Sequence, residues 1–307
     1  MIKKKIEDKE LVKHLASLPE DGREVFLLQN GQIRLTALQA TNMICQMKAN
    51  HELGLLETYV LGQAYLAGGL LSANVKGNDR VQLNIECGGP IGGISIEAWA
   101  CGAVRGYLKH NPIPLEKPLT SLDLNELYGP GFLSITKVLE GNKSPFTGQI
   151  MMEFGNLAKD LALYYHQSEQ TPSLFSLSIQ FDKNGNVVGS GALFLQAMPL
   201  CNEGVLEALQ EKSTSLPSIG AFLSEGKTIA EYVETEFADF DCKHLAHQGL
   251  GFSCPCSREQ YVQYLKNLNK AEQQDILKSG PFPLQLVCFN CNSTYDFEKP
   301  ELESLFS

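Results

Sequence analysis

Four cysteines near the C-terminus form two close pairs, Cys254-Pro-Cys256 and Cys288-Phe-Asn-Cys291, with 31 residues between them. Two such pairs, brought together by the chain between them, supply the four sulfur ligands of a tetrahedral structural zinc site. The C-x-x-C half has the usual knuckle spacing, and the C-x-C half is less common. We therefore predict one zinc ion per chain, bound by Cys254, Cys256, Cys288 and Cys291.

A zinc ion with four thiolate ligands has no open coordination position, so the site is not expected to activate water. Thiolates are, however, the form of cysteine that oxidants attack. We expect oxidation to join each close pair, Cys254 to Cys256 and Cys288 to Cys291, and to displace the metal. Structural zinc contributes ~10–16 kcal/mol in finger peptides, against ~5–15 kcal/mol for the whole stability of a domain. Metal loss should therefore unfold the surrounding segment.

Other interpretations of these cysteines stay open at this point. The four thiols could be buried and inert, or they could bind zinc in a ribbon that does not switch. A thiol oxidoreductase using Cys288-Phe-Asn-Cys291 is a further possibility, although that motif normally precedes a helix and here lies between short strands.

The remaining cysteines are not expected to bind the metal. Cys45, Cys87, Cys101 and Cys201 lie in apolar or glycine-rich surroundings, and we expect all four to be buried as small side chains. Close upstream of the zinc pairs, His244 and His247 follow Cys242. We interpret the histidines as surface residues, while a ligand exchange onto them, or a side disulfide through Cys242, stays open.

Residues 244–307 form the predicted C-terminal zinc module. Ser257 with Gln260, and Asn269 with Glu272, have the spacing of helix N-terminal capping boxes. Two short strands, 284–287 and 295–297, flank the second cysteine pair. The segment has little apolar mass, and small modules of this kind usually need a metal to fold.

Residues 201–243 precede this module and are strongly acidic. Between Cys201 and Cys242, nine acidic residues face two lysines, and Pro217, Gly220 and Gly226 divide the segment into short pieces. Isolated helices of fewer than ~12–15 residues are marginal in water, so any helical order must come from docking onto a neighbour. A metastable helical linker and a plain acidic linker fit this composition equally well.

Residues 1–200 have mixed patterns, which predict an α+β core of sheet and helix. We expect helices at 35–47 and 53–71, and a further helix capped by Asn156. Residues 81–87 and 94–98 alternate around a glycine-rich turn, and 174–181 with 187–196 flank the turn Asp182-Lys-Asn-Gly185. Both patterns predict β-hairpins.

Composition limits the possible partners of the 307-residue chain. The net charge is −10 and the pI is about 5.2, without a basic patch that could bind a phosphate backbone, which argues against nucleic acid. The most apolar stretch, 53–75, contains Glu57, Gln63 and several glycines, so no membrane span is expected. No apolar segment follows the basic N-terminus, so we expect the protein to stay in the cytoplasm, where thiols are reduced.

The sequence resembles the heat shock protein 33 family of bacterial redox-regulated holdase chaperones. The cysteine pairs match the family's zinc motif in order and spacing, and the likeness covers nearly the whole chain. The segments that carry it in the core are Gly88-Gly-Pro-Ile-Gly-Gly93, Val104-Arg-Gly-Tyr107, residues 131–137, Ser168-Glu-Gln170 and residues 189–199.

The resemblance implies a chaperone rather than an enzyme. The reduced, zinc-bound form would be inactive. Oxidation would release zinc, unfold the C-terminal module and the linker, expose apolar surface and favour a homodimer that binds unfolding client proteins without ATP during oxidative stress. The competing hypothesis is a zinc-ribbon binding module attached to an enzyme-like or nucleic-acid-binding core.

Overall fold

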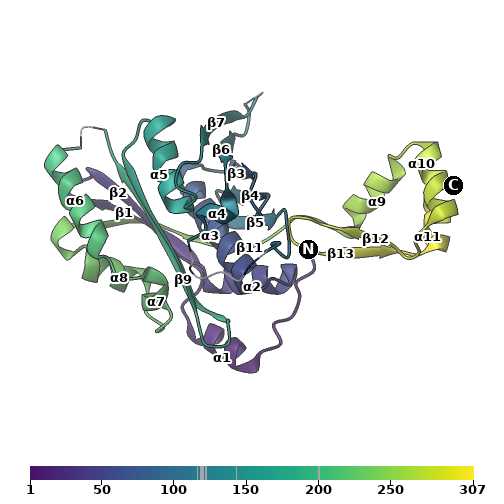
Figure 1. The fold of residues 1–307 in the computed structure, drawn as a ribbon, viewed down its shortest axis with the longest axis horizontal. Helices are drawn as coiled ribbons and strands as arrows, with labels where there is room; N and C mark the ends of the chain where they lie inside the picture. Colours follow the sequence, from purple (N-terminus) through teal and green to yellow (C-terminus); the bar gives the residue numbers. More distant parts are fainter. Residues whose placement is uncertain (116, 118–120, 122, 143, 200) are drawn as a thin grey trace.

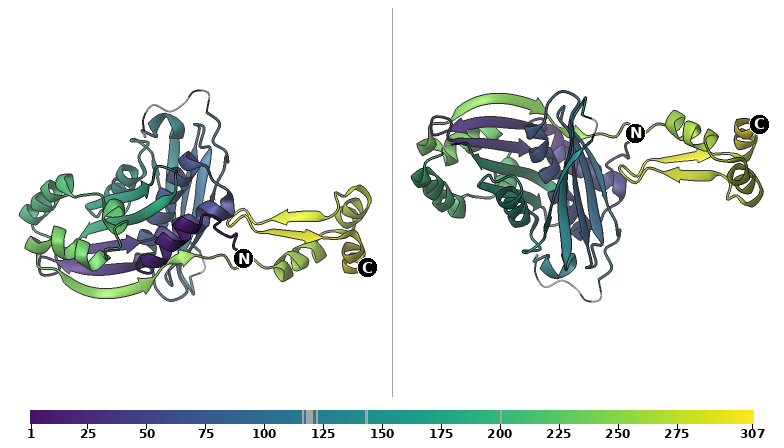
Figure 2. Two further views of the ribbon diagram at one scale, coloured as in Figure 1. Left: turned by 90° about the horizontal axis from the view of Figure 1, so that it is seen from below. Right: turned by 90° about the horizontal axis from the view of Figure 1, so that it is seen from above.

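The computed structural model describes residues 1–115, 117, 121, 123–142, 144–199 and 201–307. Two β-sheets and their helices form a core, and a narrower C-terminal module projects from it along the long axis of the molecule (Figure 1). Both views in Figure 2 show that the module joins the core at one end only. The α+β fold predicted from the sequence is confirmed.

The first sheet has five strands in the order β10-β1-β2-β9-β8, and every neighbouring pair is antiparallel. Its strands are β1 Gly22–Leu28, β2 Ile33–Gln39, β8 Ser173–Phe181, β9 Val187–Ala197 and β10 Lys243–Gly249. The predicted hairpin around Asp182-Lys-Asn-Gly185 is confirmed as β8 and β9. The predicted helix at 35–47 is wrong in its first half, because residues 33–39 form β2 and only Thr41–His51 (α2) is helical.

The second sheet has six strands in the order β11-β5-β4-β3-β6-β7. Its strands are β3 Arg80–Cys87, β4 Gly93–Trp99, β5 Ala103–Leu108, β6 Gly131–Val138, β7 Phe146–Met151 and β11 Gly251–Phe252. The predicted hairpin across Gly88–Gly93 is confirmed as β3 and β4. Helix α3, Leu55–Leu71, contacts strands of both sheets and is buried along most of its length, as expected of a helix at the centre of a core.

Smaller elements complete the core. They are α1 Lys9–Ser17, η1 Ser72–Asn74, α4 Asn125–Tyr128 and α5 Leu157–Gln167. Asn156 caps α5 as predicted, since its side chain accepts a hydrogen bond from the Lys159 N–H.

The acidic segment is helical and docked. It forms α6 Glu203–Ser215, α7 Ile219–Leu223, α8 Ile229–Glu236 and η2 Ala238–Phe240, with breaks near Pro217 and Gly226. These elements pack on the five-stranded sheet and share an apolar core with it (Figure 1). The linker side of this core includes Leu223, Tyr232, Val233 and Phe237, and the sheet side includes Phe26, Leu28, Ile33, Leu35, Leu193 and Leu195. Docking therefore supplies the order that short acidic helices lack alone.

Glycines bring α7 into direct contact with the sheet. A Cβ atom at Gly189 of β9 would lie 2.1 Å from the carbonyl oxygen of Gly220 in α7, and a Cβ at Gly220 would lie 2.7 Å from Ser178 Oγ. Side chains at either position would push helix and sheet apart. The expectation that Gly220 interrupts the helical segment is wrong, because Gly220 lies inside α7, where its missing side chain permits close packing on the sheet.

The C-terminal module contains α9 Arg258–Lys266, α10 Lys270–Ser279, β12 Leu284–Val287, β13 Thr294–Phe297 and α11 Lys299–Phe306. Ser257 caps α9, and Asn269 with Glu272 forms a complete capping box at α10. The first residues of the predicted module pair with the core, since β10 lies beside β1 and β11 lies beside β5. The division into a core (1–200), a linker (201–243) and a module (244–307) stays a prediction about which parts fold as units.

Candidate metal centre

The sulfur atoms of Cys254, Cys256, Cys288 and Cys291 all lie within 4.8 Å of one another, and all four residues are buried. The Sγ atoms of Cys254 and Cys288 are 3.8 Å apart, and those of Cys256 and Cys291 are 3.3 Å apart. A tetrahedron with zinc–sulfur bonds of about 2.3 Å has edges of about 3.8 Å. The donor set and its spacing therefore fit a zinc ion.

Two separate turns present the sulfurs. Cys254 and Cys256 lie between β11 and the start of α9, while Cys288 and Cys291 lie in the turn that joins β12 to β13. Within this turn the Cys288 N–H donates to the Ser293 carbonyl at 2.9 Å, and the Asn292 N–H donates to the Cys288 carbonyl at 2.7 Å. Asn292 has a φ of 52°, a left-handed conformation that asparagine tolerates better than most residues.

Polar groups surround the sulfurs. Arg105 of β5 places Nη1 3.2 Å from the Cys254 Sγ, and its guanidinium also contacts Glu97 and lies over the Trp99 ring. The hydroxyl of Ser293 lies 3.2 Å from the Cys291 Sγ, and that of Tyr295 lies 3.4 Å from the Cys256 Sγ. Sequence reasoning missed Arg105, because it lies far from the cysteines in the chain.

The close packing of the thiols shifts their protonation. Hydrogen bonds from Cys288 and Cys291, and then from Arg105, lower the pKa of the Cys254 thiol. The same contacts with Cys254 raise the pKa of Cys288 and of Cys291, because one thiolate opposes the formation of another. Four thiolates at this spacing require a multivalent cation, and Arg105 offsets only one charge.

The centre lies where the module meets the core. Asn50, at the C-terminal end of α2, is fully buried, and its Nδ2 donates to the carbonyls of Cys291 and Ile2, each at 2.9 Å. Its own carbonyl accepts from Asn292 Nδ2 at 2.9 Å. The Gly106 N–H of β5 donates to the Asn290 carbonyl at 3.2 Å. The cysteine turns are therefore fastened to α2, β5 and the N-terminal segment.

The other cysteines differ from the expectation. Cys45 is buried as predicted, but Cys101 is exposed, and Cys87 and Cys201 are only partly buried. Cys101 lies in the tight turn between β4 and β5, where its side chain is left outside the sheet.

His244 and His247 are surface residues, as interpreted from the sequence. They lie on β10 and contact Glu24 of β1, with His244 Nε2 3.3 Å from a carboxylate oxygen. Neither belongs to the cluster of sulfurs. Cys288 and Cys291 lie in a turn between strands and not at the start of a helix, so the arrangement does not match a thioredoxin-like redox motif.

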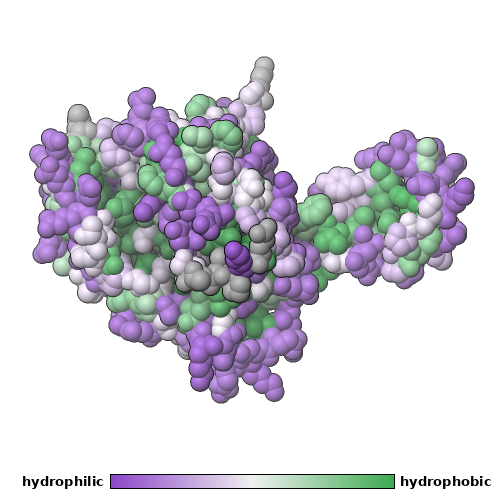
Figure 3. Space-filling model, viewed as in Figure 1, coloured by the Kyte–Doolittle hydropathy of each residue, from purple (hydrophilic) through white to green (hydrophobic). Residues whose placement is uncertain are grey.

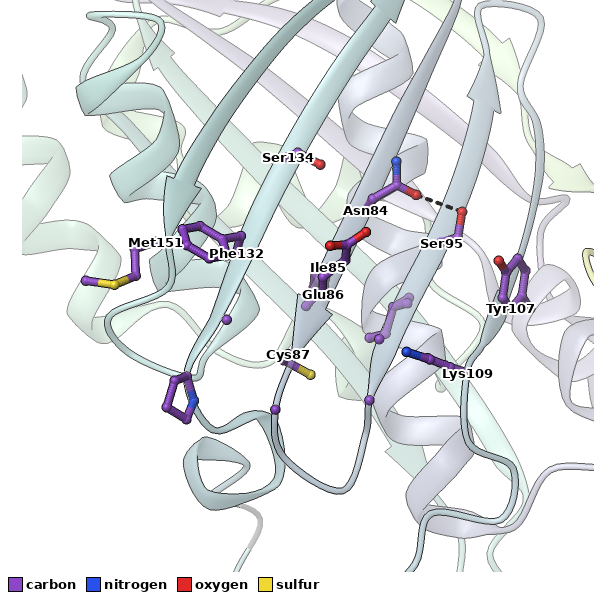
Figure 4. A pocket seen from close by; sticks show the side chains of 16 residues that line it. Asn84, Ile85, Glu86, Cys87, Ser95, Tyr107, Lys109, Phe132, Ser134 and Met151 are labelled. Atoms are coloured by element: carbon purple, nitrogen blue, oxygen red, sulfur yellow. Dashed lines mark hydrogen bonds between the residues drawn. The ribbon is translucent and has the colours of Figure 1, made fainter.

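A shallow depression of about 880 Å³ lies on the outer face of the six-stranded sheet. Figure 4 shows Phe132 and Met151 on one side of it and Tyr107 and Lys109 on the other. Phe132 is 50% exposed and Met151 62% exposed. The module also carries exposed apolar side chains, Phe289 at 76% among them, and Figure 3 shows apolar surface along it.

Among the described residues, no helix combines the length and the apolar character that crossing a membrane requires.

Comparison with known proteins gives a consistent result. The model of the family described as "Hsp33 protein" matches residues 21–298. The chain is 33% identical to the 33 kDa chaperonin of Desulforamulus reducens, over 90% of this chain and 94% of that protein. It is 30% identical to the 33 kDa chaperonin of a Geobacillus strain, over 91% and 95%. The crystal structure of the Thermotoga maritima 33 kDa chaperonin, a heat shock protein 33 homologue, aligns with a TM-score of 0.83 and 27% identity, over 94% of this chain and 98% of that one.

Proposed function

The chain belongs to the Hsp33 family, and from this premise we propose that it is an ATP-independent holdase chaperone that oxidation of a four-cysteine zinc centre activates. The observation that carries this proposal is the buried cluster of four sulfurs at the junction of core and module. The proposed ligands are Cys254, Cys256, Cys288 and Cys291. Zinc bound there would hold the four sulfurs as thiolates and tie the two turns together.

Oxidation removes the groups that bind the metal. Each disulfide forms from two thiolates, which pass two electrons to one molecule of a peroxide, so two peroxides oxidise the whole centre. We propose the pairs Cys254–Cys256 and Cys288–Cys291, as expected from the sequence. A bond between Cys256 and Cys291 would instead close a loop of about 36 residues and constrain the unfolded chain by about 4 kcal/mol. The short-range pairs leave the module free to unfold.

Unfolding of the module would reach the linker through β11 and β10. Both strands follow the linker directly in the chain, and β10 is a sheet edge exposed along its length. Undocking of α6–α8 would uncover the apolar sheet face that contains Phe26, Leu28 and Leu35. A newly exposed apolar surface is what unfolding clients bind.

The remaining parts of the proposal rest on the family resemblance. The oxidised protein would form a homodimer, act in the cytoplasm under oxidative stress, and bind unfolding proteins without catalysing a reaction. Neither nucleic acid nor membrane is a proposed partner.

A client protein that aggregates on heating tests the proposal. The reduced, zinc-loaded chain and its peroxide-treated form are mixed with the client, and light scattering and zinc release are followed together. We expect protection only after oxidation, with about one zinc released per chain. The variant Cys101→Ser, which lacks an exposed cysteine outside the centre, should switch normally, whereas Cys288→Ser should not retain zinc.

Two outcomes would contradict the proposal. Equal protection by the reduced and oxidised forms would exclude the switch. Absence of protection in both forms would exclude the holdase and favour a zinc-ribbon binding module.

A further inference from the structure

A second pocket, of about 810 Å³, lies at the end of the core where the two sheets meet. Its walls come from β1, β2 and β10 of the five-stranded sheet, from the loop that follows α3, and from the turn between β4 and β5. Part of the lining is apolar and includes Val25, Leu27 and Leu245, the last of which is 48% exposed.

The pocket is cationic in a protein whose net charge is −10. Arg23, Arg34 and Lys76 line it, and the lining contains no Asp or Glu. In the part of the chain that the structure describes, none of these three makes an ion pair with a carboxylate. The fourth basic side chain, His247, is different because its ring contacts Glu24.

The two arginines are held by neutral oxygens. Arg23 is 94% buried, and its guanidinium donates to the carbonyls of Ala100 at 2.8 Å and Gly69 at 3.3 Å. Arg34 donates to the carbonyl of Ala73 at 2.9 Å and to Asn74 Oδ1 at 2.6 Å. Burial, and then the charge of Arg34, lower the pKa of Arg23 to about 10. The two like charges therefore oppose each other across the pocket.

The end of α3 offsets only part of this charge. Gly69 and Ala73 lie in and just after the last turn of α3, where the helix dipole supplies the equivalent of about half a negative charge. The three positive charges of Arg23, Arg34 and Lys76 exceed this half charge severalfold. Of the three cations, Arg23 is buried, Arg34 is half-buried and Lys76 is exposed. A cation as buried as Arg23 is costly without a counter-charge, so the site as built favours an anion.

We propose that this pocket binds a small organic anion, in which a carboxylate or phosphate group is attached to an apolar body. The anionic group lies against Arg23, Arg34 and Lys76, since the guanidinium fork matches both headgroups. The apolar body lies against Val25 and Leu245. The negative charge and the apolar part are both required, because the lining offers both kinds of contact.

Binding at this site also affects the position of β10. Leu245 through Gln248 of β10 form one wall of the pocket, so a ligand there holds β10 against β1. A ligand that binds only the docked arrangement stabilises it in proportion to its concentration. This effect on activation rests on the proposed function, whereas binding itself does not.

Calorimetric titration of the reduced, zinc-loaded full chain tests the proposal. The probes are hexanoate and hexyl phosphate, with hexanol as the uncharged analogue and inorganic phosphate as the headgroup alone. We expect saturable binding of at least one hexyl anion, about tenfold or more tighter than hexanol and inorganic phosphate. Whether hexanoate or hexyl phosphate binds more tightly shows whether the natural ligand carries a carboxylate or a phosphate group.

Variants place the binding site. Lys76 is exposed, so Lys76→Glu should leave the fold intact and weaken binding of the anion by about tenfold or more. Arg34→Gln should weaken it at least as much. Lys183→Glu makes the same charge change in the exposed turn between β8 and β9 and should leave affinity unchanged.

The proposal is wrong if neither anion binds better than hexanol, or if Lys183→Glu weakens binding as much as Lys76→Glu does. The role in activation is tested separately, by the peroxide dose needed for client protection. A bound hexyl anion should raise that dose. If the anion binds tightly but the peroxide dose is unchanged, only the proposed effect on β10 is wrong. If oxidation does not activate the protein at all, the proposed function is wrong, and the binding site is unaffected.

Discussion

Phe237 offers the most direct test of whether linker docking keeps the chaperone inactive. The side chain is fully buried in the core shared by the linker and the five-stranded sheet, and its ring lies 5.9 Å from that of Phe240. Replacing a buried phenylalanine by alanine costs about 3–5 kcal/mol. If that cost falls on docking, Phe237→Ala raises the undocked fraction of the linker about 100- to 4,000-fold.

We therefore expect reduced, zinc-loaded Phe237→Ala protein to suppress client aggregation without any oxidant. Hydrogen exchange of residues 203–240 should accelerate by a similar factor, while about one zinc per chain is retained. Gly189→Ala is a second variant with the same expected effect, because its Cβ would meet the Gly220 carbonyl in α7.

Phe194→Ala is the matched control. Phe194 lies on β9 of the same sheet and is also fully buried, but it packs in the other core, stacked on Phe175 at 4.2 Å. It should lower global stability without activating the reduced protein. The reasoning is refuted if Phe237→Ala accelerates exchange of the linker but gives no protection, or if Phe194→Ala activates the chain equally.

Three further predictions concern the metal centre and pH. Arg105→Gln should weaken zinc retention against a chelator by about tenfold or more. Arg80→Gln is the control, because Arg80 also contacts Glu97 but contacts no sulfur, and it should retain zinc normally. Equal effects of the two variants would rule out a role for the contact between Arg105 and the sulfur. Peptide mapping of the peroxide-treated chain should find both disulfides within the close pairs, and a Cys256–Cys291 bond would contradict this. Burial raises the pKa of Asp21 to about 6, so its contribution to stability is complete below pH 4 and disappears as pH rises through 6. Between pH 5 and 7.5 the free energy of unfolding should therefore fall by about 1.4 kcal/mol more in the natural chain than in Asp21→Asn, and parallel profiles in urea titrations would contradict the shift.

The sequence was most informative where local chemistry decides structure. Cysteine spacing predicted which four sulfurs meet, and capping residues such as Asn156 and Asn269 marked where helices begin. Both signals depend on residues only a few positions apart.

Long-range packing could not be predicted in this way. The strand β2 is buried on both faces, by the linker on one side and by α3 on the other. Residues 35–39 therefore lack the alternating pattern of a half-buried strand, and their sequence alone predicts a helix. The Arg105 contact to Cys254 joins residues 149 positions apart. Whether the acidic segment docks depends on glycines in β9, which the composition of the linker cannot show.

The position of β10 and β11 predicts the order in which segments of the chain unfold after oxidation. These strands connect the last linker turn to the first sulfur ligand, and the two residues of β11 pair with β5 next to Arg105. Loss of the sulfur ligands would free the chain first at Cys254, then at β11 and β10, and only afterwards at η2 and α8. A protease added during oxidation should accordingly cut near residue 253 before it cuts near residue 226, so that early fragments still contain an intact linker.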